Sequence, residues 1–408
     1  MVRKPVSGDN WLDSRSSAPV HPTMKACVLC DIACIEVRDV PRPLVPPGHV
    51  LLRISAVGIC GTDAHIFAGH ANYHTDESGR TVPLTTHPQI LGHEISGQIE
   101  ELDSQIRGLN PGDRVVVDQG LNCVSAHREQ LCEYCRSGDS HQCDCYGEHG
   151  ITGLQGGLAE FIAVPASNVV RLTTTLDMAE AAMAEPLGCV VHSSDAVARA
   201  RTRYAIRGAA GEERRVRHVL ICGAGPAGLL FLQYLRRALG YDGLLLVSEP
   251  NDTKRKLALH FGADEVLDPR GGDLGQAVRE RTGGRGVEYL IEASGEGRVF
   301  ASIPTLIRKQ ATVLAYGHGH AGVELSVLNS VMFKEPTLIT PVGASGGFEP
   351  DGRPSVYTRA LRLIENREIE VASFITHRYT SLDAVQGALA RDMHAPGYVK
   401  GVVVLQQR

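Results

Sequence analysis

A glycine-rich motif just past the middle of the chain constrains the fold more than any other feature. An apolar run at residues 219–222 leads directly into the sequence Gly-Ala-Gly-Pro-Ala-Gly, and a helical pattern follows as far as Leu235. In this strand–turn–helix context, the glycines let the backbone approach a pyrophosphate at the N-terminus of the helix. We therefore predict a βαβ unit that binds a dinucleotide through the turn formed by Gly223, Gly225, Pro226, Ala227 and Gly228.

The sequence after this motif predicts a parallel sheet and favours NAD as the dinucleotide. Strand-like segments alternate with helical ones through residues 244–315, which is the pattern of a doubly wound α/β domain. The first of these strands ends beside Glu249, where a carboxylate accepts hydrogen bonds from the adenosine ribose and repels a 2′-phosphate. Lys254 and Arg255 follow closely, so NADP remains the alternative, and Lys254 is a candidate cofactor contact.

Length, charge and cysteine usage narrow the class of protein. A chain of 408 residues predicts two or three domains. The net charge of -5 argues against nucleic acid or an anionic membrane as the main partner. No run approaches the roughly 18 apolar residues of a membrane span, and the first 23 residues lack the apolar core of a secretory signal. The 11 cysteines are clustered, as metal ligands in a reducing compartment are, so we expect a cytoplasmic protein.

Residues 58–94 contain the side chains expected to carry the chemistry. Cys60 stands near the start of this stretch, and His93 and Glu94 close it. A thiolate, an imidazole and a carboxylate are the ligand types that zinc accepts, and three protein ligands leave a fourth position for water or substrate. We predict a catalytic zinc held by Cys60, His93 and Glu94.

Two further residues complete a recognisable pattern. Thr62 lies two residues after Cys60, and His65 lies five residues after Cys60. With these residues and the Gly-His-Glu sequence at 92–94, the chain resembles the zinc-containing medium-chain dehydrogenase/reductase family, which includes alcohol, sorbitol and threonine dehydrogenases. The resemblance runs from about Met24 to the C-terminus.

The resemblance implies a two-domain α/β organisation, with a GroES-like β-barrel catalytic domain and a Rossmann NAD-binding domain. Short strands punctuated by proline and glycine between residues 25 and 57 agree with a barrel-like β domain. The implied bounds are an N-terminal extension at residues 1–23, the catalytic domain at 24–188 and 345–408 with a structural-zinc lobe at about 118–147, and the cofactor domain at 189–344.

The resemblance also implies roles for three more side chains. Thr62 and His65 occupy the positions of the family's proton relay; the plainer alternative is that Thr62 caps a helix and His65 packs. Glu185 precedes a proline, and in the polyol and threonine dehydrogenases a Glu-Pro at this place reaches the zinc directly or through water. Glu185 would then be the fourth group at the zinc, which points toward polyhydroxylated substrates and away from simple alcohols.

A second cysteine cluster resembles the family's structural-zinc lobe. The spacing of Cys132, Cys135 and Cys143 matches its last three ligands, and a closed site wants four thiolates. The position of the first ligand, three residues before Cys132, holds Glu129 instead. Cys123 can serve if six residues are inserted after it, and we favour Cys123 because thiolates suit structural zinc better than a lone carboxylate. A lobe without metal is a third alternative.

The predicted function is that of a zinc-dependent oxidoreductase. The expected reaction transfers a hydride between NAD and a secondary alcohol of a polyol, sugar or cyclitol, with oxidation of an amino alcohol such as L-threonine as the nearest alternative. A non-catalytic dinucleotide-binding protein is the alternative from a different class. An insertion between His65 and His93 either covers the substrate pocket or is a solvated surface loop. By resemblance the protein is a homodimer or homotetramer, formed through the cofactor domain and its apolar segment at residues 331–342.

Overall fold

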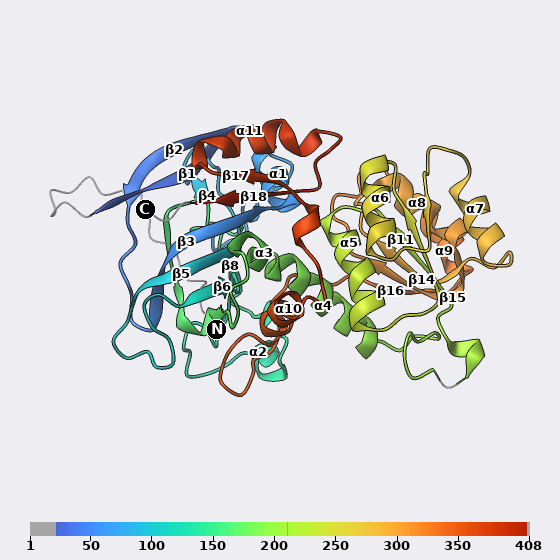
Figure 1. The fold of residues 1–408 in the computed structure, drawn as a ribbon, viewed down its shortest axis with the longest axis horizontal. Coiled ribbons are helices and arrows are strands. Elements are labelled where there is room, and N and C mark those ends of the chain that lie inside the picture. The colour runs from blue at the N-terminus through green and yellow to red at the C-terminus, as the bar shows by residue number, and fades with distance from the viewer. Residues whose placement is uncertain (1–21, 210, 406–408) are drawn as a thin grey trace. The chain divides into compact units, whose positions relative to one another are not determined.

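The structure is a computed structural model that describes residues 22–209 and 211–405 (Figure 1). Nearly all of the expected N-terminal extension, residues 1–23, lies outside the described residues. The chain divides into two compact units. The first comprises Met1–Gly188, Ala344–Glu365 and Val371–Arg408, and the second comprises Cys189–Gly343 with Asn366–Glu370.

The first unit is built on a seven-stranded, mainly antiparallel sheet. Its strand order is β10-β6-β5-β3-β18-β17, and β9 also pairs with β3. Figure 1 shows the C-terminal strands, in red, among the blue and cyan strands of the N-terminal half. The strands are β3 (His49–Ile59), β5 (Glu94–Leu102), β6 (Arg114–Val117), β9 (Phe161–Pro165), β10 (Val169–Arg171), β17 (Ile375–Tyr379) and β18 (Lys400–Val404).

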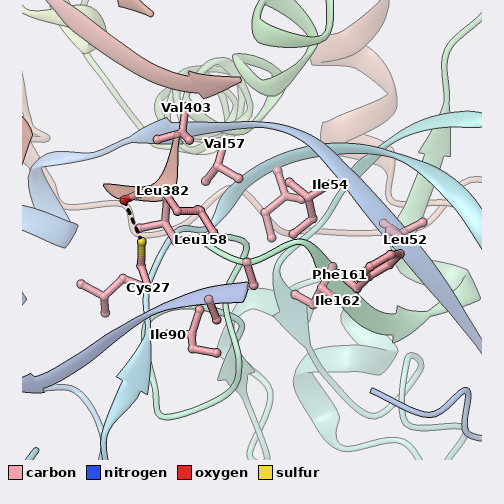
Figure 2. Packing of buried hydrophobic residues seen from close by; sticks show 14 of the residues in the cluster. Cys27, Leu52, Ile54, Val57, Ile90, Leu158, Phe161, Ile162, Leu382 and Val403 are labelled. Carbon is pink, nitrogen blue, oxygen red and sulfur yellow. Dashed lines mark hydrogen bonds between the residues drawn. The ribbon is translucent and has the colours of Figure 1, made fainter. Parts of the chain in front are cut away.

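A buried apolar core lies between this sheet and a second, three-stranded one. The smaller sheet has the order β2-β1-β4, from Cys34–Pro41, Thr23–Asp31 and Gln89–Ile90. Figure 2 shows side chains of β3 packing against residues of β4, β9 and β18, with Leu52, Ile54 and Val57 in the middle. The thiol of Cys27 donates to the carbonyl of Leu382 at 3.2 Å, which ties β1 to the C-terminal segment.

The long strand β3 brings the chemistry-bearing stretch together. β3 pairs with β5 in antiparallel register, so that Gly58 lies opposite Glu94. Cys60 follows the end of β3 and is the N-cap of helix α1 (Gly61–Phe67). β18 pairs with the same end of β3, with Gly401 opposite Ile59. Three strands from distant parts of the sequence therefore meet at one point.

Short helices and hairpins complete the first unit. The short helix α3 (Met178–Ala182) begins after its N-cap Asp177, whose side chain accepts hydrogen bonds from the backbone of Ala179 and Glu180. Pro186 does not end a helix but lies in the first turn of the next one, where its missing N–H has no consequence. The remaining elements of this unit are α2 (Glu133–Ser137), α10 (Ser355–Glu365), α11 (Val385–Ala390), β7 (Gly120–Leu121) and β8 (Gly147–Glu148). Helix α4 (Ala184–Arg199) starts in this unit and continues into the second, which begins at Cys189.

The second unit contains the predicted parallel sheet. Its order is β13-β12-β11-β14-β15-β16, and every pairing is parallel. The chain builds outward from β11 in both directions, so the order reverses between β11 and β14, where such sheets bind their ligands. The strands are β11 (His218–Cys222), β12 (Leu244–Ser248), β13 (Glu265–Leu267), β14 (Val287–Glu292), β15 (Ile307–Ala315) and β16 (Thr337–Ile339).

Helices connect these strands, as the alternating pattern predicts. They are α5 (Pro226–Gln233), α6 (Asp252–Phe261), α7 (Leu274–Arg281), α8 (Gly297–Leu306) and α9 (Val327–Met332). Among the described residues, no helix combines the length and apolar character needed to cross a membrane.

A buried carboxylate fastens α10 to the segment after β10. Glu365 accepts hydrogen bonds from the backbone N–H groups of Thr173 at 2.6 Å and Thr174 at 3.0 Å and from both threonine hydroxyls, and it pairs with Arg362. Its side chain is 1% exposed. Burial raises the pKa of Glu365, but the hydrogen bonds from Thr173 and the charge of Arg362 outweigh burial, and the net pKa is lowered.

Replacing Glu365 with alanine should reduce the free energy of unfolding by about 3 kcal/mol, because several buried donors lose a charged acceptor. Urea denaturation measures the loss, and Glu368→Ala, at an exposed position, is the matched control. Since the pKa of Glu365 is lower in the folded protein, its stabilisation is present above the ordinary value of 4.5 and is lost as the pH falls below it. A difference between Glu365→Ala and the parent that stays constant down to pH 3 would contradict this account.

Candidate active site

The structure brings the three predicted zinc ligands together. The sulfur of Cys60, a ring nitrogen of His93 and a carboxylate oxygen of Glu94 all lie within 4.8 Å of one another. His93 is 2% and Glu94 1% exposed, whereas Cys60 is partly exposed. The group arises from the register of β3 and β5, because Cys60 follows one strand and His93 and Glu94 begin the other.

Asp63 connects the two halves of this group and was not identified from the sequence. The Asp63 carboxylate is fully buried and accepts hydrogen bonds from the backbone N–H groups of Cys60 at 2.8 Å and Gly92 at 3.1 Å. Its Oδ1 lies 3.6 Å from Nδ1 of His93. A carboxylate beside the outer nitrogen of a histidine orients the ring toward a metal. The only sequence signal was its place three residues after Cys60.

Lys400 supplies the positive charge next to the same group. Its Nζ donates to Oε1 of Glu94 at 2.5 Å and to the carbonyl oxygen of Ile59 at 2.9 Å, and the side chain is 3% exposed. The other carboxylate oxygen of Glu94, Oε2, is buried without a hydrogen-bond partner, as is Nδ1 of His93. No local pattern reveals Lys400, which is 306 positions from Glu94.

These donors fit a zinc ion. Burial lowers the pKa of the His93 imidazole, but the charges of Asp63 and Cys60 outweigh burial and hold this pKa well above its ordinary value. The acidic neighbours Asp63 and Cys60 therefore favour a positive charge at this buried place, which a bound cation would supply. With one oxygen of Glu94 bound by Lys400, the unpartnered Oε2 is available as a metal ligand.

Gly58, two residues before Cys60, has to be a glycine because of the position of the Glu94 side chain. A Cβ atom on Gly58 would lie 1.8 Å from Oε2 of Glu94 and 3.0 Å from the methyl group of Met183. A Cβ atom on Gly61, at the start of α1, would meet no other atom within 4 Å.

Replacing Gly58 with alanine should therefore displace the Glu94 carboxylate and lower bound zinc at this site by at least tenfold. Replacing Gly61 with alanine should leave zinc content unchanged, because the added methyl group meets no atom. Inductively coupled plasma mass spectrometry of the two purified variants measures this. Full zinc content in the Gly58 variant would contradict the proposed ligand geometry.

Glu185 lies in a buried polar network but not in the three-membered ligand group. It is 5% exposed in the first turn of α4, and its Oε1 accepts a hydrogen bond from the side-chain amide of Gln119 at 3.3 Å. The same amide lies 3.4 Å from Oε1 of Glu148, and the hydroxyl of Tyr357 donates to the amide oxygen. The negative charge of Glu185 also raises the pKa of Lys400, which indicates that Glu185 lies near the ligand group.

Thr62 and His65 both lie on α1. The hydroxyl oxygen of Thr62 is 3.8 Å from the sulfur of Cys60. His65, in the last turn, has its ring centroid 6.1 Å from that of His70. Both side chains are partly exposed, so the helix leads from the ligand group toward solvent.

The insertion after α1 has an ordered structure of its own. Oδ1 of Asp76 accepts hydrogen bonds from the backbone N–H groups of Ser78 at 2.8 Å and Arg80 at 3.1 Å, which closes a tight turn. Burial raises the pKa of Tyr73, and the charges of Glu148 and Cys60 raise it further. Tyr73 of the insertion therefore lies near Glu148 and Cys60.

The structure gathers four cysteine sulfurs in a second group. It brings Cys123 to the other three, with all four sulfurs within 4.8 Å of one another, and Glu129 is not part of the group. Cys132 is the N-cap of α2, and the sulfurs of Cys123 and Cys143 are 3.5 Å apart. Four mostly buried thiols with such spacing suit a closed tetrahedral zinc site.

Cys123→Ser should remove one zinc per chain and lower the thermal midpoint by several degrees, because structural zinc contributes directly to folding. Glu129→Gln should change neither. Zinc content and differential scanning calorimetry test the pair together. Zinc loss in the Glu129 variant with retention in the Cys123 variant would reverse the assignment.

The glycine motif of the second unit has the geometry of a dinucleotide-binding turn. Gly223 has a φ of +99°, and a Cβ on Gly228 would lie 1.9 Å from the Gly223 carbonyl oxygen. Gly225 is the N-cap of α5, with Pro226 in its first turn. Ala227 lies in that turn as well.

Glu249 follows β12 and faces this turn. Its carboxylate accepts hydrogen bonds from the backbone N–H groups of Ala224 and Asn251, each at 2.8 Å. Arg255 donates to the carbonyl oxygens of Glu249 and Pro250 and pairs with an aspartate, so its guanidinium is largely engaged. Lys254 is partly buried at the start of α6.

Two family models match the chain. The one described as an alcohol dehydrogenase GroES-like domain covers residues 46–174, and the one described as zinc-binding dehydrogenase covers residues 226–366. They confirm the predicted combination of a GroES-like domain with a Rossmann-like parallel sheet.

Individual relatives span most of the chain. The L-threonine 3-dehydrogenase of Pyrococcus abyssi is 31% identical over 350 residues, which is 86% of this chain and 89% of that protein. The erythritol/L-threitol dehydrogenase of Mycolicibacterium smegmatis is 28% identical over 377 residues, covering 91% and 95%. Among solved structures, a zinc-binding dehydrogenase from Sinorhizobium meliloti 1021 bound to NADP has a TM-score of 0.76 at 28% identity, covering 94% of this chain and 100% of that one.

Proposed function

The chain belongs to the zinc-containing medium-chain dehydrogenases, which are oxidoreductases acting on CH–OH donors, and from that premise we propose that it oxidises a secondary alcohol of a polyol, sugar or cyclitol with NAD. The observation that carries the proposal is the buried group of Cys60, His93 and Glu94, in which one carboxylate oxygen lacks a partner.

Each residue of the site has a role in this proposal. Cys60, His93 and Glu94 would hold the zinc, with Glu185 as a further ligand directly or through water. When bound, zinc acts as a Lewis acid toward an alcohol oxygen. The Thr62 hydroxyl takes up the proton that the substrate hydroxyl loses as it gives up its own, and the imidazole of His65 passes a proton to solvent.

The polar groups of the site support a hydroxyl-rich substrate. The carboxylates of Glu148 and Glu185 converge on one neutral amide, that of Gln119. The nearby cation, Lys400, is already bound to Glu94. Such a site offers carboxylate acceptors to the neighbouring hydroxyl groups of a substrate.

Oxidation of an amino alcohol is the second candidate. The Pyrococcus abyssi relative is named L-threonine 3-dehydrogenase. The same two carboxylates, Glu148 and Glu185, would attract an ammonium group as readily as they would accept hydroxyl hydrogen bonds.

The proposed cofactor is NAD. The Glu249 carboxylate stands where a 2′-phosphate would have to bind, and Arg255, the nearest arginine in sequence, is engaged by backbone carbonyls and Asp268. Lys254 would contact the cofactor from the start of α6. The NADP in the Sinorhizobium meliloti relative makes a parallel test of both cofactors necessary.

We also propose that the protein is a homo-oligomer formed through the second unit. β16 is the last strand of its sheet, and large apolar side chains in and around it are exposed, among them Met332 at 65%, Leu338 at 49% and Val342 at 61%. An exposed apolar patch at a sheet edge is a typical site of subunit association.

The decisive experiment follows nicotinamide absorbance while zinc-loaded protein is offered linear polyols, cyclitols, sugars and L-threonine, with NAD and NADP in parallel. We expect reduction of NAD by a polyol or cyclitol. Cys60→Ser should lose at least 100-fold in kcat through loss of the metal, while NADH still binds by fluorescence. Turnover of L-threonine alone would establish the second candidate, and no turnover by zinc-replete protein would contradict both.

A further inference from the structure

The second unit contains a cavity far along its sheet from the dinucleotide-binding turn. Its volume is about 470 Å³, and the residues that line it come from the loop after α4, the start of β15 and the end of α9: Arg203, Tyr204, Arg308, Lys309, Gln310, Phe333, Lys334 and Glu335. The glycine turn follows the carboxyl end of β11, whereas residues 308–310 lie at the amino end of β15. In a parallel sheet the carboxyl ends of all strands lie on one side and the amino ends on the opposite side. The dinucleotide therefore does not account for this cavity.

The cavity carries uncompensated positive charge. Arg308 is paired with the buried carboxylate of Glu288 at 2.5 Å. Arg203 donates to the neutral side-chain oxygen of Gln310 at 3.0 Å, and Lys334 donates to the carbonyl oxygen of Ile307 at 3.1 Å. Within residues 22–209 and 211–405, no carboxylate lies within 4.0 Å of the charged nitrogens of Arg203, Lys309 or Lys334.

Glu335 is the one acidic residue of the lining. The lining has an excess of two positive charges, because three cations without a carboxylate partner, Arg203, Lys309 and Lys334, stand against this one carboxylate. The two guanidinium groups are held over the ring of Tyr204, with centroid distances of 5.6 Å for Arg203 and 4.9 Å for Arg308. The arginines are therefore positioned by an aromatic side chain, while most of their N–H donors remain available.

Two residues of the lining adopt an unfavourable backbone conformation. Gln310 has a φ of +59° and Glu335 a φ of +45°, in the left-handed region that non-glycine residues rarely occupy. The two are neighbours: Nε2 of Gln310 donates to Oε2 of Glu335 at 3.4 Å, and the backbone N–H of Gln310 donates to the carbonyl oxygen of Lys334 at 2.6 Å. Backbone strain of this kind concentrates at ligand-binding sites.

We propose that this cavity binds the phosphoryl group of a small molecule. Guanidinium and ammonium donors from three segments converge on a space whose excess charge matches a phosphate dianion, and phosphate oxygens accept several charge-assisted hydrogen bonds at once. Phe333, which is 79% exposed, adds aromatic surface for the organic part of such a ligand. This site is distinct from the dinucleotide-binding turn and does not depend on the proposed reaction.

Isothermal titration of inorganic phosphate into the full chain, saturated with NADH so that the dinucleotide site is filled, tests the proposal. We expect one site per chain and at least tenfold weaker binding in the double variant Arg203→Ala/Lys309→Ala. Lys256→Ala, which removes one positive charge, is a control for net charge, because this lysine is 75% exposed on α6, on the other side of β11 in the strand order. It should leave phosphate binding unchanged. Retained NADH binding in each variant shows that the unit is folded.

Four results would overturn the proposal. The first is failure of phosphate to bind to the parent protein at tens of millimolar, and the second is binding to the double variant as strong as binding to the parent. The third is binding of succinate as tight as that of phosphate, which would make the cavity a general anion site. Loss of phosphate binding in Lys256→Ala to the same extent as in the double variant would count equally against it, because net charge alone would then explain the effect.

Discussion

The buried ion pair between Lys400 and Glu94 is the interaction on which the candidate active site depends. It joins the start of β5 to the start of β18, and a second hydrogen bond fastens Lys400 to the last residue of β3. Two charges are removed from water here, which is costly unless each is fully partnered. Because Lys400 binds only one oxygen of Glu94, the other oxygen lacks a partner, and together with the sulfur and imidazole beside it this oxygen suits the metal that we propose there.

The strand register makes this arrangement possible. Gly58 lies opposite Glu94 because β3 and β5 are paired as they are, and a side chain at Gly58 would occupy the place of the carboxylate. Asp63 then holds the two chain segments by their backbone N–H groups. The site is therefore built by the sheet and one helical turn, elements that move little, which suits a metal site whose ligands have to be preorganised.

The sequence predicted the site residues that lie close together in the chain, but not those that come to the site from distant segments. Cys60, His93 and Glu94 could be proposed together because their residue types fall in one short stretch. The parallel sheet could be predicted because the spacing of apolar residues differs between strands and helices. Lys400 and Gln119 gave no signal, since their roles come from strands that pair across long sequence separations.

The central claim is that Cys60, His93 and Glu94 hold a zinc ion. Diffraction data collected on either side of the zinc absorption edge, from crystals grown with zinc, test it directly. The account predicts two anomalous peaks per chain, one among these three side chains and one among Cys123, Cys132, Cys135 and Cys143. The claim would be contradicted by a peak at the four cysteines and none beside Glu94, in a crystal in which the Lys400–Glu94 ion pair is intact.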